Sequence, residues 1–215
     1  MKKILVVVLV IAIALIGTSA MATTIVNSKH DLSNTGTTNY YRSVGTNEIC
    51  VFCHTPHAAN NTAPLWNKST TGSTFVQYTS ASVSATMGQP GPISKACLSC
   101  HDGTLSVSAV LNQPGSQTIT EGAAKGNVLA SGKISGNPNL GTDLTNDHPV
   151  SFTYNGANPT LKPMASAKGL QIMFYGTGKD QVECASCHAV HDPQNVPFLR
   201  LSNAGSNLCL ACHNK

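Results

Sequence analysis

The sequence predicts a mostly irregular fold with a few short helices and minimal strand. Charged residues make up only 10% of the chain and aromatic residues 5%, while 18 glycines and 11 prolines interrupt it. The stretch 113–146 has Gly, Pro or Asn every few residues, which is typical of loop with an occasional short strand. Helical patterns are limited to a turn or two at each cysteine motif and to residues 165–175.

This composition does not fit a disordered chain either. The apolar fraction is 41%, and the net charge of +4 is low for the length of the chain. Disordered segments combine low hydrophobicity with high net charge. We therefore expect a folded domain in which something other than side chains supplies part of the core.

The first 22 residues have the pattern of a secretory signal peptide. Lys2 and Lys3 precede an unbroken apolar run from Ile4 to Ile16, and small residues lead to a cleavage site after Ala22. A run of about 13 apolar residues is shorter than the roughly 20 needed to cross a bilayer. We therefore expect export of one domain, residues 23–215, with no membrane span.

All eight cysteines form C-x-x-C pairs, and a histidine directly follows each pair. The pairs are Cys50/Cys53, Cys97/Cys100, Cys184/Cys187 and Cys209/Cys212, and the histidines are His54, His101, His188 and His213. C-x-x-C-H is the signature of c-type haem attachment, in which the thiols bond to the porphyrin and the adjacent imidazole ligates the iron. The sequence therefore predicts a single multihaem c-type cytochrome domain built around four covalent haem c groups, numbered 1 to 4 in chain order.

Disulfide bonds and zinc binding are alternative uses of these cysteines. Four disulfides are compatible with an exported protein, but they do not explain a histidine after every second cysteine. A zinc site is complete with four ligands, so paired C-x-x-C motifs would leave the four adjacent histidines without a role. Haem attachment accounts for all of these residues.

Four further histidines lie outside the motifs: His30, His57, His148 and His191. Their number equals the number of expected haems, so we expect each iron to take one of them as its distal ligand. Methionine–histidine ligation raises the potential of a haem, so ligation by two histidines favours a low potential. It also leaves no open coordination position, which predicts an electron carrier and no enzyme activity at the iron.

The stretch "CVFCHTPH" (residues 50–57) has a second histidine one short turn after the proximal one. Residues three apart on a helix have Cβ atoms about 5–6 Å apart, so His57 lies on the proximal side of haem 1. It cannot pass around the porphyrin and must ligate another iron. The stretch "CHAVH" (residues 187–191) repeats the spacing, so His191 is expected to serve a haem other than haem 3.

Several stretches together resemble multihaem c-type cytochromes from the outer surface of metal-reducing bacteria, in particular the OmcE-like tetrahaem cytochrome nanowires. They are "KHDLS" (29–33), "EICVFCHTPH" (48–57), "CLSCHDGT" (97–104) and "NDHPVSF" (146–152). The resemblance covers nearly the whole mature chain. It implies a fold of low secondary structure around a closely spaced haem chain, and electron export to extracellular acceptors such as metal oxides. In filament-forming members, one histidine ligates a haem of the next subunit.

Loop lengths suggest partners for the distal histidines. His30 is expected to fold over haem 1, which the resemblance supports, His148 to ligate haem 2, and His191 to ligate haem 4. Haem 3 then has only His57, either within one subunit or from a neighbouring copy. The resemblance implies the second option.

The basic isoelectric point does not indicate nucleic-acid binding. Loss of Lys2 and Lys3 leaves about +2, and eight haem propionates with four ferric centres bring the total to about −2. The chain also lacks a basic cluster with interleaved aromatic residues.

The sequence thus predicts a low-potential electron-transfer cytochrome, and the resemblance implies that it lies at the cell surface and forms head-to-tail filaments with copies of itself. Its other partners are redox cytochromes and extracellular acceptors. The alternatives are a monomeric periplasmic tetrahaem shuttle and a multihaem reductase with one open haem.

Overall fold

Most of the chain consists of loops and turns in the computed structural model, which describes residues 25–37 and 39–214. The expected signal peptide, residues 1–22, lies outside the described residues. Helical segments are η1 (Cys50–Phe52), α2 (Pro92–His101), α3 (Met164–Gly169), α4 (Cys184–Cys187), η2 (Ala204–Ser206) and α5 (Asn207–Leu210). The strands are β1 (Val76–Gln77), β2 (Asp143–Leu144), β3 (Phe152–Thr153) and β4 (Gln181–Val182). Strands β1 and β2 form a parallel pair, and strands β3 and β4 form an antiparallel pair.

The longest helix, α2, has clear start and stop signals. Pro92 occupies its first turn, where a missing N–H costs nothing. The buried positions Ala96 and Leu98 face the interior. The helix ends before Gly103, which has a φ of +72° and whose backbone conformation few other residues tolerate.

The helix expected over residues 165–175 is shorter in the structure than the sequence predicts. Helix α3 ends at Gly169. Gln171 has a φ of +70°, which is incompatible with continuing a right-handed helix. The residues that follow are not helical, and Ile172 and Phe174 are buried core residues.

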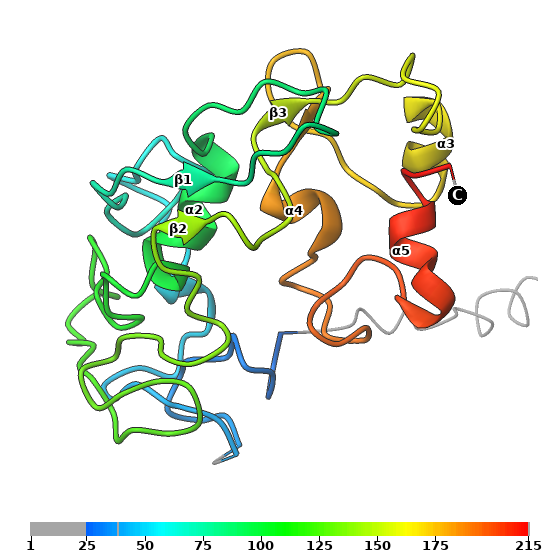
Figure 1. Cartoon of the computed structure of the whole chain (residues 1–215). Helices are drawn as coiled ribbons and strands as arrows, with labels where there is room; N and C mark the ends of the chain where they lie inside the picture. The colour runs from blue at the N-terminus through cyan, green and yellow to red at the C-terminus, as the bar shows by residue number, and fades with distance from the viewer. Residues whose placement is uncertain (1–24, 38, 215) are drawn as a thin grey trace, which may run out of the picture.

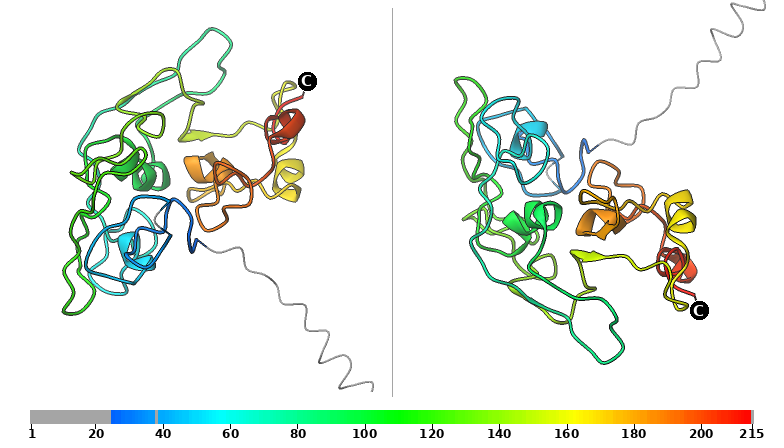
Figure 2. Two further views of the ribbon diagram at one scale, coloured as in Figure 1. Left: turned by 90° about the horizontal axis from the view of Figure 1, so that it is seen from below. Right: turned by 90° about the horizontal axis from the view of Figure 1, so that it is seen from above.

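The chain folds into two halves that meet at two short helices. One half holds η1, α2 and the loops up to β2, and the other holds α3, α4 and α5 (Figures 1 and 2). Helices α2 and α4 pack against each other at the junction. Figure 1 shows α4 between α2 and α5.

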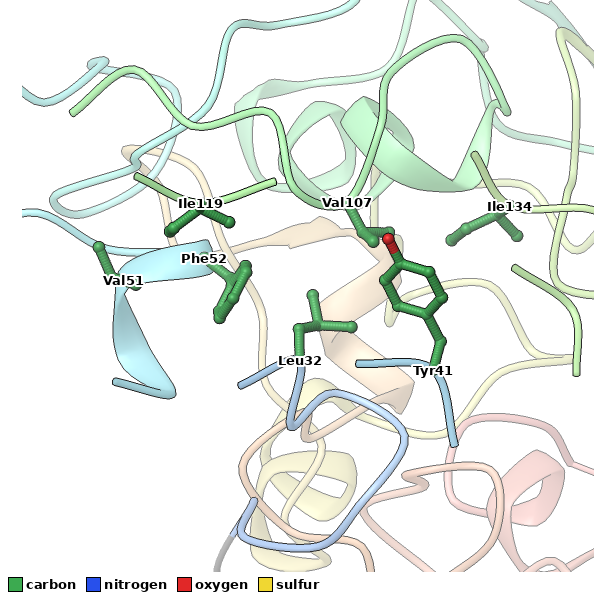
Figure 3. Close-up of a cluster of buried hydrophobic side chains, with 7 residues drawn as sticks. All are labelled: Leu32, Tyr41, Val51, Phe52, Val107, Ile119 and Ile134. Atoms are coloured by element: carbon green, nitrogen blue, oxygen red, sulfur yellow. The ribbon is translucent and has the colours of Figure 1, made fainter. Parts of the chain in front are cut away.

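The side-chain core is divided into small clusters, one in each half and a minor third. The first contains Leu32, Tyr41, Val51, Phe52, Val107, Ile119 and Ile134 (Figure 3). The second contains Tyr154, Ala167, Ile172, Phe174, Val182 and Ala211. Half-buried motif cysteines pack against both, namely Cys53 and Cys100 in the first and Cys212 in the second. The two main clusters therefore lie directly beside the expected haem attachment points.

Within the described residues, no helix has the length and apolar character needed to cross a membrane.

Candidate haem sites

Each C-x-x-C-H motif forms a single helical turn. In three motifs the histidine N–H donates a hydrogen bond to the carbonyl of the first cysteine, which closes an α-turn: His54 to Cys50, His188 to Cys184 and His213 to Cys209. The motif with Cys97 and His101 lies at the end of α2. One helical turn brings residues three apart onto the same face, so both thiols of a motif can bond to one porphyrin edge.

The proximal histidines are oriented by proline carbonyls. In three motifs Nδ1 lies within hydrogen-bond distance of a carbonyl oxygen: His54 and Pro64 at 2.9 Å, His101 and Pro138 at 2.8 Å, and His188 and Pro197 at 3.0 Å. Because a carbonyl only accepts, Nδ1 must carry the proton. Nε2 then has its lone pair free, and this arrangement is the usual one for an imidazole that binds metal.

A short segment that begins with proline lies against every motif; we call these the clamp segments. They are residues 64–67, 138–141, 159–162 and 197–200. The third residue of each is apolar and pairs with the backbone of the motif histidine: Trp66 with His54, Leu140 with His101, Leu161 with His213 and Leu199 with His188. Sequence reasoning missed these segments, whose only signal is Pro-x-Leu or Pro-x-Trp.

The first and third motifs form a structural repeat together with their clamps. Equivalent hydrogen bonds join Asn67 N to Cys53 O (2.9 Å) and Arg200 N to Cys187 O (2.8 Å), and also Thr55 N to Leu65 O (2.8 Å) and Ala189 N to Phe198 O (2.7 Å). Leu65 and Phe198, the second clamp residues, both have a positive φ, +56° and +59°. His57 and His191 therefore occupy equivalent positions in the two repeats.

Three of the histidines outside the motifs each lie opposite a motif histidine. The ring centroids are separated by 6.2 Å for His30 and His101, 6.2 Å for His54 and His191, and 6.4 Å for His148 and His213. Two imidazoles that bind one metal ion from opposite sides, with metal–nitrogen bonds of about 2.0 Å, have ring centres about 6 Å apart. The three spacings therefore fit an iron between each pair.

The protonation state of His30 and His101 also suits binding to an iron. Burial, reinforced by the nearby His101, lowers the pKa of His30 to about 4, and burial also lowers that of His101. Both imidazoles are then neutral at pH 7, which is the form that binds metal. Nδ1 of His30 is buried and has no hydrogen-bond partner among the residues that the structure describes. Nδ1 of His148 lies 2.8 Å from the carbonyl oxygen of Pro149, so each ring has a nitrogen available to a metal.

The pairing of these histidines differs from the one expected from loop lengths. His30 faces the haem 2 histidine rather than that of haem 1, His191 faces haem 1 rather than haem 4, and His148 faces haem 4 rather than haem 2. The expectation that His191 serves a haem other than haem 3 agrees with this geometry. The pairings based on loop length do not match these ring spacings, because a longer loop costs little extra closure entropy and loop length therefore ranks partners only weakly.

His57 and His188 stand outside these pairs. In the described part of the chain, the ring of neither is paired with that of another histidine. The turn that carries His57 is exposed from Pro56 to Ala58. The third motif is therefore the one whose histidine ring has no histidine ring opposite it in the described chain, although His188 lies near enough to His30 to contribute to lowering its pKa.

Thiols of successive motifs lie close to one another. Hydrogen bonding to Cys184 raises the pKa of Cys97. Burial, with a smaller contribution from Cys100, raises the pKa of Cys53 to about 12. Burial and the neighbouring Cys212 raise that of Cys187 to about 11. Each of the first three motifs therefore has a cysteine near a cysteine of the next motif along the chain.

Glu183 holds the second and third motifs together. Its side chain is 4% exposed and accepts hydrogen bonds from the Ser94 backbone (3.2 Å), the Ser94 hydroxyl and the Ser151 hydroxyl (2.7 Å). It also forms a capping box with Ser186 at the start of α4. One carboxylate therefore caps α2 and α4, the helices that carry Cys97 and Cys184.

Replacing Glu183 with Ala is expected to lower the free energy of unfolding by about 2–4 kcal/mol, because two helix caps are lost and buried donors are left unpaired. Urea unfolding followed by circular dichroism measures the change. Glu183→Gln keeps an acceptor oxygen and should cost less, and Glu121→Ala, at an exposed position, should cost almost nothing. An equal loss in all three variants would contradict this role.

Comparison with known families identifies the last two motifs. Residues 177–215 match the family model described as "Doubled CXXCH motif". No curated protein matches the chain. A doubled C-x-x-C-H motif indicates covalently bound haem c and a multihaem c-type cytochrome. Such a protein carries electrons.

Proposed function

We propose that the chain is a tetrahaem electron-transfer cytochrome whose irons are each ligated by two histidines. The three imidazole pairs at 6.2–6.4 Å carry this proposal, because each joins a motif histidine to one outside the motifs. Each bound haem supplies a one-electron iron couple. The chain orients three of the motif histidines through the clamp segments, and burial keeps the imidazoles of His30 and His101 neutral. Ligation by two histidines favours a low potential.

Copies of the chain join head to tail through His57 in this proposal. His191 reaches across from the third motif to face His54 of the first, and His57 is its counterpart in the structural repeat. His57 is exposed, and His188 has no ring partner within the described chain, so the two are complementary if they belong to neighbouring subunits. Such a heterologous contact does not close on itself and generates a filament.

A filament of this kind suits electron transport out of the cell. We place the protein at the cell surface, with other cytochromes as electron donors and metal oxides as acceptors. The support for this location is the signal-peptide pattern of residues 1–22 and the resemblance to outer-surface cytochromes.

The first test is the number and state of the haems. The intact mass of the mature protein should exceed that of the polypeptide by four haem masses, and a thiol reagent should modify none of the cysteines. The assembled protein should show only low-spin haem in its magnetic circular dichroism spectrum. A mass with three haems or fewer, or tightly bound zinc, would reject the tetrahaem proposal.

A reductase with one open haem is the second candidate, and one observation favours it. Within the described chain the His188 ring has no histidine partner, so a monomer would expose one coordination position at haem 3. Rapid carbon monoxide binding to the reduced, fully assembled protein would support the reductase. Carbon monoxide binding that appears only after dispersal to monomers would support the filament.

A further inference from the structure

Lys68 is a fully buried lysine that the proposed haem ligation does not use. Its side chain is 2% exposed. Nζ donates hydrogen bonds to the carbonyl oxygens of Ser106 (3.3 Å), Val107 (2.9 Å) and Ala109 (2.8 Å). An ammonium group has three N–H donors and no acceptor. Three carbonyl acceptors therefore match the charged form, whereas a neutral amine has one donor too few.

Among the described residues, Lys68 is hydrogen-bonded to no carboxylate, although the buried carboxylate of Asp102 also lies near Cys100. The three hydrogen bonds of Lys68 all end on backbone carbonyls. Lysine is almost never fully buried unless it is paired with an opposite charge. A charge in a low-dielectric interior acts over a longer distance than one at the surface.

Lys68 lies beside the attachment points of haems 1 and 2. It follows Asn67, the last residue of a clamp segment, whose N–H bonds to the carbonyl of Cys53. Val107, which accepts a hydrogen bond from Lys68, packs in the first core cluster together with Cys53 and Cys100.

We propose that Lys68 raises the reduction potentials of haems 1 and 2 relative to those of haems 3 and 4. Reduction takes one electron and lowers the charge of a ferric haem centre by one, so a fixed positive charge nearby disfavours the oxidised state. An electron that enters a subunit is then held preferentially by haem 1 or haem 2, because the haems of higher potential are reduced first. This inference depends on the proposed tetrahaem function.

The test is a spectroelectrochemical titration of purified Lys68→Met after its four haems have been verified by mass. At a fixed applied potential, the ratio of reduced to oxidised haem should fall about tenfold for two of the four haems, which equals 59 mV for one electron. The other two should not shift. The control Lys125→Met removes an exposed lysine, whose field water and salt screen, and should change none of the four potentials.

Lys68→Gln separates the charge from the packing, because the amide keeps two N–H donors for the same carbonyls. It should lower the same two potentials as Lys68→Met. Unchanged potentials in Lys68→Gln, or equal shifts of all four haems, would overturn the role of Lys68 and leave the tetrahaem function intact. Failure of both variants to fold with four haems would also overturn it, because the ammonium would then be a structural requirement. A wild-type protein without four haems would reject the proposed function itself.

Discussion

Substitution of His57 by alanine is expected to convert the filament into monomers that still carry four covalent haems, one of them high-spin. His57 lies in an exposed turn after the first motif, so its loss changes neither a thioether nor the core. It removes only the proposed ligand of haem 3 in the neighbouring subunit, and with it the coordination bond between subunits. Negative-stain microscopy measures the assembly, and the charge-transfer band of high-spin ferric haem measures the ligation.

His191→Ala is the matched control because His191 is the counterpart of His57 in the structural repeat. Its ring faces His54 of the same subunit. The variant should likewise gain one high-spin haem, but it should still form filaments. The contrast therefore separates loss of a ligand from loss of a contact between subunits.

Two results would contradict the intersubunit bond. If His57→Ala forms filaments of normal length while one haem becomes high-spin, His57 acts within its own subunit. If the wild-type protein forms no polymer at any concentration, the monomeric shuttle is the better description. Both results leave the haem attachment sites unaffected, because those depend on the C-x-x-C-H motifs.

The attachment chemistry of the site could be predicted from the sequence because it depends on short motifs that bind haem covalently. A C-x-x-C-H turn is local, so its helical conformation and its attachment chemistry require no knowledge of the rest of the fold. The argument that His57 cannot reach its own haem is equally local, since it follows from a separation of three residues. The same argument for His191 agrees with the position of its ring opposite His54.

The partners of the distal histidines could not be predicted because they depend on long-range folding. Loop length ranks candidates only weakly, since each doubling of a loop adds about 0.6 kcal/mol of closure entropy. His30 passes over the nearer first motif and faces His101. The clamp segments could not be predicted for a related reason. A proline two residues before a leucine or tryptophan is not a distinctive pattern, and Pro64, Pro138 and Pro197 are distinguished by their hydrogen bonds to the motif histidines.

The assignment of His148 to haem 4 predicts an effect that depends on the presence of that haem. The rings of His148 and His213 lie 6.4 Å apart, whereas loop length had suggested haem 2. His148→Ala in the four-haem protein should produce one high-spin haem under either assignment. A second background is therefore needed to identify which haem lost its ligand.

A chain with Cys209→Ser and Cys212→Ser cannot attach haem 4 and provides that background. If His148 ligates haem 4, adding His148→Ala to this three-haem chain should create no high-spin haem, because its iron is already absent. Residues that share one interaction show such non-additivity, whereas independent sites add. His30→Ala is the control: its ring faces His101, so it should create one high-spin haem in both backgrounds. A high-spin signal from His148→Ala in the three-haem chain would instead assign His148 to another haem, and the pairing inferred from the ring spacing would be wrong.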